Sequence, residues 1–242
     1  MNEVVRTILD HTSIRKFNNE KITEEQVRII LESAMRGATA GNMMLYSIIE
    51  IRSKDTLEKL SKSCDEQRFI GDAEIALLFV VDSYKWYRFF KSRGVLDQYT
   101  DFKGPQISDF LLGMEDAMIA AQNAVVAAES LGIGACYIGD IMENIEYHKK
   151  LFNLPEYTMP ASLVVLGNFD HKPELRPRFA KRHVVFKERY PDIEDEFIDE
   201  MFASKEINEK DFAMKFYERK MIAPFSKEMI RSIELYMKDW KK

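Results

Sequence analysis

The sequence predicts a central β-sheet flanked by helices, and two observations support this fold class. Short apolar or β-branched runs at residues 46–51, 74–82 and 159–169 are typical of strands. In about eight other segments the apolar residues recur at helical spacing, so the chain mixes strands and helices as layered domains do. The 242 residues suffice for one large domain or two small ones.

The amino-terminal part is expected to begin with a helix and a strand. Thr23 and Gln26 have the spacing of a capping box, and apolar residues follow at helical intervals up to Gly37, which is expected to stop the helix. The run YSIIEI at 46–51 then predicts a strand. A second helix is expected after Asp55.

The middle of the chain contains a buried strand and two contrasting helices. The run EIALLFVVD at 74–82 is apolar, which predicts a strand buried on both faces. Residues 84–94 interleave aromatic and basic side chains. Because the whole chain is acidic, we expect a helix that packs its rings against the body, not a nucleic-acid surface. Residues 109–131 are apolar on nearly all sides, which predicts a central helix buried on most sides and ending at Gly132.

The stretch GIGACYIGD at 132–140 does not match the dinucleotide-binding fingerprint, because Tyr137 replaces the last glycine and the stretch follows a helix. We expect a helix end and a loop, in which glycine would let the backbone approach a flat ligand. The run at 159–169 predicts another buried strand. The charged segment after Pro191 has helical periodicity, which predicts surface helices attached to the core.

Composition argues against several classes of function. The net charge of −5 argues against nucleic acid as a partner, because phosphate binding needs a basic face. No apolar stretch reaches the roughly 18–20 residues of a membrane span, and the first residues do not read as a signal peptide. Cys64 and Cys136 form no disulfide framework, so a cytoplasmic location is expected. The four histidines are scattered, and no metal site is expected.

Three polar stretches remain as candidate sites, and each has two interpretations. HTSIRKF at 11–17 is either a solvated helix end or an anion cradle in which Arg15 and Ser13 hold a phosphate. GATAGNMM at 37–44 is either an ordinary turn or a loop that admits a ligand edge. HKPELRPRFAKRH at 171–183 is either a solvated basic loop or a second contributor to the anion site.

The sequence offers no catalytic side chain. No serine, cysteine or threonine can be paired with a general base, and no carboxylate pair has a glycosidase context. If the chain is an enzyme, a cofactor is expected to carry the chemistry.

Four stretches, taken in order, resemble motifs of the nitroreductase family of FMN-dependent oxidoreductases, and the resemblance covers residues 3–190. HTSIRKF resembles the S-x-R phosphate motif, and ATAGNMM resembles the A-x-S-x-x-N-x-Q loop. GIGACYIGDI resembles the G-x-G-x-x-x-I-G segment, and VVLGNFDHKPELRPR resembles a strand with a following basic turn. The match is best with the larger branch, which includes the oxygen-insensitive NADPH nitroreductases and bacterial flavin reductases.

This resemblance implies an α+β sandwich with a central, mostly antiparallel sheet flanked by helices and a C-terminal helical extension. It implies an FMN-binding core over residues 1–190 and an extension of the same domain over 191–242. The expected assembly is a homodimer with FMN at the interface, and nucleic acid and membrane are not expected as partners.

The resemblance also implies the cofactor-binding residues. One group would hold the phosphate and the polar flavin edge, a second would line the flavin, some of it from the second subunit, and a third would cover one flavin face. Carried over by motif position, the implied set is His11, Ser13 and Arg15; Thr39, Ala40 and Asn42; Gln67; Tyr137, Ile138 and Gly139; and Arg176 and Arg178.

The implied reaction is a ping-pong cycle in which NADPH or NADH passes a hydride through flavin N5 to a nitroaromatic, a quinone or free flavin. The flavin carries the chemistry, so no catalytic side chain is implied. The alternatives are an FMN-dependent reductive dehalogenase, a non-catalytic flavin-binding protein and a helical interaction protein without cofactor.

The chain departs from the family pattern at several motif positions. Thr12 stands where the branch usually has a basic residue, and Met44 replaces a glutamine. Asp140 stands where glycine is common, and Arg176 replaces lysine. Asn168–Phe169 replaces the G-x-P continuation. Asp140 would place a negative charge near the flavin or its entrance.

Overall fold

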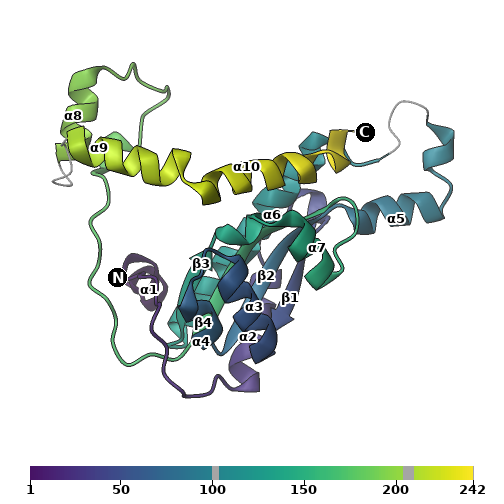
Figure 1. Cartoon of the computed structure of the whole chain (residues 1–242), viewed down its shortest axis with the longest axis horizontal. Helices are drawn as coiled ribbons and strands as arrows, with labels where there is room; N and C mark the ends of the chain where they lie inside the picture. Colours follow the sequence, from purple (N-terminus) through teal and green to yellow (C-terminus); the bar gives the residue numbers. More distant parts are fainter. Residues whose placement is uncertain (100–103, 204–209, 242) are drawn as a thin grey trace. The chain divides into compact units, whose positions relative to one another are not determined.

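A computed structural model describes residues 1–99, 104–203 and 210–241 (Figure 1). The chain divides into two compact units. The first comprises residues 1–173 and 228–242, and the second comprises residues 174–227. The sequence predicts that residues 1–190 form an FMN-binding core and that residues 191–242 extend it. This division by function stays a prediction.

The first unit is built on a four-stranded sheet with the order β1-β2-β4-β3, in which every neighbouring pair is antiparallel. The strands are β1 (Tyr46–Ile51), β2 (Ile75–Asp82), β3 (Gly134–Ile138) and β4 (Thr158–Gly167). The central strands β2 and β4 are buried along their whole length. The predicted sheet and three of its strands are therefore confirmed.

The fourth strand, β3, was not predicted, and the expectation of a loop after Gly132 was wrong for residues 134–138. The strand has only five residues and begins with glycine, so its pattern is weak. It is ordered by tertiary pairing, because Gly134–Ile138 aligns residue by residue with Leu163–Gly167 of β4.

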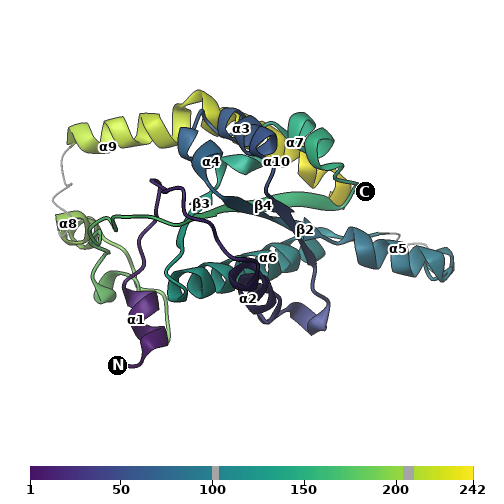
Figure 2. The ribbon, with the colours of Figure 1, turned by 90° about the horizontal axis from the view of Figure 1, so that it is seen from below.

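Helices cover both faces of the sheet (Figure 2). On one face lie α2 (Glu24–Met35) and α6 (Ile107–Ser130), and on the other lie α3 (Lys54–Ser63), α4 (Arg68–Asp72) and α7 (Ile145–Phe152). Alternate residues of β2 serve the two layers: Leu77 and Phe79 join the core under α6, whereas Leu78 and Val80 join the core under α3. The predicted layered α+β fold is confirmed.

The helix ends follow the predicted signals. Thr23 and Gln26 form the capping box of α2, with each side chain bonded to the other residue's backbone N–H. Helix α6 ends at Ser130 and is capped by Leu131, and Gly132 then takes a left-handed conformation with φ of 77°.

The composition of α6 predicted a helix buried on most sides, and this prediction was wrong. One face packs on the sheet and on α2, but a second apolar strip is exposed. The strip follows helical spacing and comprises Ile107, Leu111, Leu112, Met118 and Ile119.

Among the residues that the structure describes, α6 is the one helix long and apolar enough to cross a membrane. Its buried face, with Phe110, Ala117 and Val125, forms part of the protein core. The core helix of a soluble protein passes the same test.

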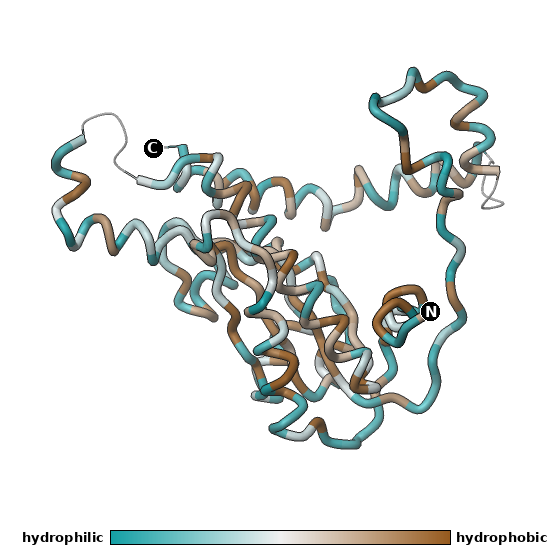
Figure 3. The backbone as a smooth tube through the Cα atoms, turned by 180° about the vertical axis from the view of Figure 1, so that it is seen from behind, coloured by the Kyte–Doolittle hydropathy of each residue, from teal (hydrophilic) through white to brown (hydrophobic). Residues whose placement is uncertain are grey.

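Two further helices of the first unit expose apolar side chains. The short helix α1 (Glu3–Leu9) is mostly apolar, as its brown colour beside the N label in Figure 3 shows. The aromatic helix α5 (Tyr84–Ser92) was predicted correctly as a helix. Tyr84 and Tyr87 pack on the core as expected, whereas Phe89 is exposed.

The carboxyl-terminal segment is helical as predicted, with α8 (Asp195–Ala203), α9 (Lys210–Tyr217) and α10 (Pro224–Met237); residues 204–209 and 242 lie outside the described residues. Its end is not a surface element, however. Tyr236 and Trp240 are fully buried in the first unit's core, where Trp240 packs edge-on against Phe110. Short helical turns complete the chain at Ala40–Asn42, Leu96–Gln98, Asp140–Met142 (η3), Lys181–His183, Glu218–Ile222 and Asp239–Lys241.

The second unit has its own small aromatic cluster. The ring of His183 packs edge-on against Phe197, and Phe186 lies between Phe197 and Tyr190. Arg182 pairs with Glu200 of α8. These contacts connect residues 182–190 with helix α8 and the residues around it.

Candidate functional site

The segment His11–Phe17 has no helix or strand of its own and is held along the edge of the sheet. The backbone N–H of Ile14 donates to the carbonyl of Ala135 in β3 at 2.9 Å, and that of Asn18 donates to the carbonyl of Asn168 at 2.8 Å. The predicted anion motif is therefore fixed against β3 and the end of β4.

A pair of glycines makes this close approach possible. Gly134 of β3 and Gly167 of β4 face each other in the sheet. A Cβ atom added at Gly134 would lie 2.8 Å from Ile14, and one added at Gly167 would lie 2.6 Å from the ring of Phe17. Any other residue at these positions would push the motif off the sheet. At Gly134, glycine thus serves packing rather than the approach of a flat ligand.

Two polar groups of this segment are available to a ligand. The guanidinium of Arg15 is exposed and lies 5.8 Å above the ring of Phe69, and no described acidic side chain of the first unit pairs with it. The hydroxyl of Thr12 is buried, and it has no hydrogen-bond partner among the described residues. A buried hydroxyl without a partner is uncommon in folded proteins and points to a missing polar ligand.

The other two predicted members of the motif are already engaged within the protein. His11 Nδ1 lies 2.6 Å from the carboxylate of Glu129 in α6. The Ser13 side chain contacts the thiol of Cys136. The structure thus places His11, Ser13 and Arg15 on one segment, with Arg15 as the unpaired charge.

Gln67 precedes by two residues Phe69, over whose ring the Arg15 guanidinium lies. Its Nε2 donates to the Asp140 carboxylate at 2.7 Å and to the Cys64 carbonyl at 3.0 Å. The structure therefore brings Gln67 and Asp140 together. Asp140, which departs from the family pattern, thus accepts a hydrogen bond from the side-chain amide of Gln67.

The loop that contains Thr39, Ala40 and Asn42 is organised by a residue that the sequence analysis missed, the buried Asp116 of α6. Thr39 Oγ1 donates to Asp116, as do the backbone N–H groups of Ala40 at 2.9 Å and Leu45 at 3.1 Å. The signal was present in the sequence, because helical spacing places Asp116 on the same face as the buried Gly113, Ala117 and Ala120.

The same loop contains three residues in the left-handed region. Gly41, Asn42 and Met44 have φ values of 56°, 57° and 49°. Glycine and asparagine accept this conformation readily, but methionine does not. The N–H of Met44 donates to Thr39 Oγ1 at 2.8 Å, so the network around Asp116 holds the strained turn. The Asn42 side chain is exposed above it.

Tyr137, Ile138 and Gly139 lie at the end of the edge strand β3 and differ in what they can offer. Tyr137 donates its hydroxyl to Gln122 at 3.2 Å, and burial raises the pKa of this phenol. The Ile138 side chain is buried in the core, so it can present only its backbone to a ligand. A Cβ at Gly139 would meet nothing within 4 Å, which leaves space beside the backbone.

Arg176 and Arg178 are exposed and belong to the second unit, in a segment without regular structure. Their convergence with Arg15 on one phosphate stays a prediction.

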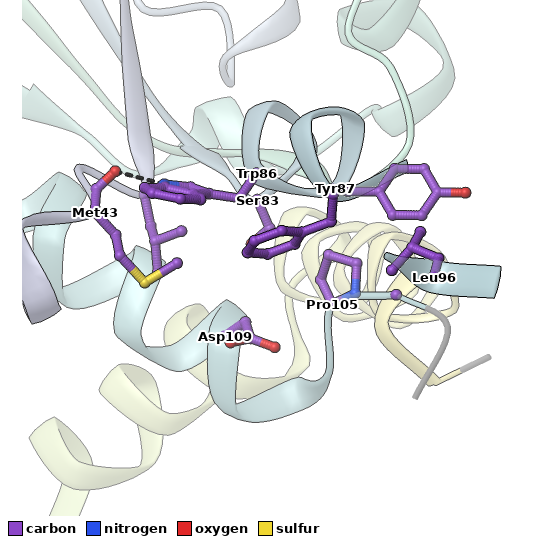
Figure 4. A pocket seen from close by; sticks show the side chains of 10 residues that line it. Met43, Ser83, Trp86, Tyr87, Leu96, Pro105 and Asp109 are labelled. Carbon is purple, nitrogen blue, oxygen red and sulfur yellow. Dashed lines mark hydrogen bonds between the residues drawn. The ribbon is translucent and has the colours of Figure 1, made fainter. Parts of the chain in front are cut away.

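A pocket of about 200 Å³ lies beside the loop at Met43 and Leu45 (Figure 4). Its wall is largely aromatic, with Trp86 and Phe90 of α5, and the Trp86 indole N–H donates to the Met43 carbonyl at 2.7 Å. None of the predicted cofactor-binding residues lines it.

The two cysteines offer no reactive nucleophile. Burial raises the pKa of Cys64 to about 12, helped by the nearby Asp140, and burial also raises the pKa of Cys136. Both thiols stay protonated near neutral pH. The site can therefore bind and orient a ligand, but covalent catalysis by cysteine is not expected.

The residues present fit a phosphate-bearing cofactor such as FMN. An unpaired guanidinium, a buried hydroxyl without a partner and open space at Gly139 meet around one sheet edge. Arginine is suited to bind phosphate through two parallel hydrogen bonds.

A comparison with protein-family models matches residues 8–168 to a family described as "Nitroreductase family". The chain belongs to the nitroreductase family. The predicted membership is therefore confirmed, and the match contains the segment of Arg15, the loop on Asp116 and the strand β3.

Several nitroreductase relatives are similar over most of their length. The FMN reductase [NAD(P)H] of Bacillus subtilis is 32% identical over 193 residues, which cover 78% of this chain and 75% of that protein. The NADPH-flavin oxidoreductase of Vibrio harveyi is 28% identical over 217 residues, 87% of each chain. The solved structure of NfrA2 from B. megaterium is 28% identical, with a TM-score of 0.81 over 98% of both chains.

Proposed function

We propose a course for the reaction of this FMN-dependent NAD(P)H oxidoreductase: a ping-pong cycle that ends on a nitroaromatic, a quinone or free flavin. The observation that carries the proposal is the family match over residues 8–168, which includes Arg15 in the stretch that resembles the family's S-x-R phosphate motif. When bound, FMN would supply the redox chemistry by taking a hydride at N5 from the nicotinamide and passing it on.

The residues of this chain would bind and orient the cofactor. Arg15 and the Thr12 hydroxyl would hold the phosphate with Ser13, and Arg176 and Arg178 would complete that site. His11 is held by Glu129 and would border it. Each charge-assisted hydrogen bond to the phosphate would contribute about 1.5–3 kcal/mol.

The remaining residues would surround the ring system. Gln67 would donate to its polar edge, and Tyr137 and the backbone of Ile138 and Gly139 would cover one face. Thr39, Ala40 and Asn42 would approach it from the loop that Asp116 holds, in part from a second subunit.

The proposed assembly is a homodimer. Two exposed apolar surfaces support it: the strip on α6 and one side of α1, where Val4, Val5, Ile8 and Leu9 are exposed. Exposed apolar area of this kind marks an interface in a soluble protein. The two free, buried cysteines agree with a cytoplasmic location.

The decisive experiment is an anaerobic titration of the purified protein with NADH and, separately, with NADPH, with the flavin absorbance as readout. We expect a yellow protein that bleaches with at least one donor and regains its colour when a nitroaromatic or quinone is added. Recovery with halogenated phenols in place of these acceptors would favour the dehalogenase. A yellow protein that bleaches with neither donor would contradict the proposal and favour a flavin-binding protein without redox turnover.

A further inference from the structure

Glu143 is a buried carboxyl group. It follows the short helix η3 and is only 4% exposed. Its Oε1 has no hydrogen-bond partner among the described residues. Asp140 and Glu143 belong to one turn, in which the Glu143 N–H donates to the Asp140 carbonyl at 3.1 Å, and the two carboxyl groups interact. Two carboxyl groups can share a hydrogen bond only if one of them holds a proton, because ionised carboxylates are acceptors only.

Among the described residues, the charged groups that act on Glu143 are acidic. Asp65 from the turn after α3 and Glu228 from α10 both face it. The charge of Glu228 is already bound by Arg231 at 2.7 Å. The Cys64 thiol, which also faces this cluster, stays protonated because burial raises its pKa to about 12.

The nearby His148 does not neutralise the Glu143 side chain. Its Nδ1 donates to the backbone carbonyl of Glu143 at 2.7 Å, and its Nε2 accepts from the Ser63 hydroxyl at 2.9 Å. Burial lowers the pKa of His148, so the ring stays neutral. Consistent with this environment, burial and the charges of Asp140 and Asp65 raise the pKa of Glu143 to about 7.

We propose that Glu143 and Asp140 hold a single proton between them near neutral pH, and that this proton positions Asp140 against Gln67. Glu143 is then a positioning residue: it donates to Asp140, while Gln67 donates to Asp140 Oδ2. Loss of the proton places two negative charges side by side in a buried site, and the Asp140–Gln67 contact is released. The proton is independent of the proposed function, whereas its effect on the cofactor rests on it.

The first test measures the proton in the flavin-free full-length chain. Infrared spectra at neutral pH should contain a protonated carboxylic acid band that disappears in Glu143→Gln and, in the wild type, at pH 9. The melting temperature supplies a second readout. Because the folded-state pKa of Glu143 is raised, its contribution to stability is present at pH 4.5 and lost as the pH rises through about 7.

The wild type should therefore lose at least about 5 °C in melting temperature relative to Glu143→Gln between pH 5 and pH 8. Asp140→Asn gives a second variant, in which the fall should begin at lower pH because the Asn amide donates to an ionised Glu143. Glu146→Gln is the matched control. Glu146 is exposed, and Arg231 lowers its pKa to about 2, so this variant should keep the wild-type slope above pH 5. A wild type with the slope of Glu143→Gln and without the infrared band overturns the proposal.

The second test measures the FMN dissociation constant by flavin fluorescence between pH 6 and pH 8. The wild-type constant should rise at least fivefold more than that of Glu143→Gln, a comparison that removes the ionisation of the FMN phosphate itself. Equal pH dependence in both proteins overturns the positioning role. A chain that binds no FMN at any pH overturns the proposed function and with it the positioning role, while the infrared band still decides the proton.

Discussion

The segment His11–Phe17 and the loop Thr39–Met44 belong to one candidate site, yet their polar groups are satisfied in opposite ways. In the loop, the Thr39 hydroxyl and two backbone N–H groups all donate hydrogen bonds to the buried Asp116. In the segment, neither the Arg15 guanidinium nor the Thr12 hydroxyl has an ion-pair or hydrogen-bond partner among the described residues. The polar groups of the loop are therefore satisfied within the protein, whereas two in the segment remain available to the proposed ligand.

Removal of the arginines proposed to hold the phosphate should have the largest effect on cofactor binding. In the double variant Arg15→Ala with Arg178→Ala, the two proposed charge-assisted contacts, worth about 1.5–3 kcal/mol each, would be lost. The FMN dissociation constant should rise by about 10²- to 10⁴-fold, and the purified protein should be colourless. Absorbance and fluorescence titration measure both.

The control removes two positive charges from another part of the chain. Arg88→Ala with Arg93→Ala acts on Arg88 of α5 and on Arg93, which follows this helix; each arginine lies over an aromatic ring. That protein should remain yellow. A double variant at 15 and 178 that is saturated with FMN would contradict the phosphate assignment.

Substitution of Asp116, which holds the loop, should mainly reduce stability. Asp116→Ala leaves three donors without their acceptor in a buried place, which costs about 3–5 kcal/mol. The melting temperature of the flavin-free protein should fall by roughly 10 °C. Asp116→Asn keeps one acceptor oxygen and should lose less. If both variants melt like the wild type, Asp116 does not hold the loop.

The glycine pair under the segment gives a third, smaller effect. Gly134→Ala places a Cβ 2.8 Å from Ile14 and should cost about 1–3 kcal/mol in chemical unfolding. Gly139→Ala is its matched control, because nothing lies within 4 Å of the new Cβ, and it should cost no more than about 0.5 kcal/mol. Equal losses in the two variants would mean that the segment is not seated on Gly134.

The smallest expected effect is that of Thr12→Val, which tests whether the Thr12 hydroxyl has a partner in the flavin-free protein. Thr12→Val removes a buried group without a partner, so the flavin-free protein should gain up to about 1 kcal/mol in unfolding free energy. FMN affinity should fall by up to tenfold. A loss of stability in the flavin-free protein would show that Thr12 already has a partner.

The fold was largely predictable because most elements carry a strong local pattern. The β-branched and continuous apolar runs of β1, β2 and β4 and the capping box of α2 identified these elements. The edge strand β3 lacks such a pattern, since it is short and opens with Gly134, and it exists through pairing with β4. The burial of Trp240 was equally invisible, because its packing on Phe110 joins residues that are distant in sequence.

The resemblance implied Arg15 and Gln67 as cofactor-binding residues, and this assignment stays a prediction. Helical spacing could indicate that Asp116 is buried, but it could not reveal that Asp116 holds the loop or that Asp140 acts on Glu143. Both depend on which buried side chains the fold brings together, and a carboxylate inside an apolar helix is the one local sign of it.

The hydrogen bond from Ile14 to Ala135 also shields the rim of the sheet. Strand β3 is at the end of the strand order, and an uncovered end strand invites pairing with another chain. Because the Ile14 N–H occupies the Ala135 carbonyl of this strand, displacement of the segment would free a carbonyl on the edge of the sheet for pairing with another chain.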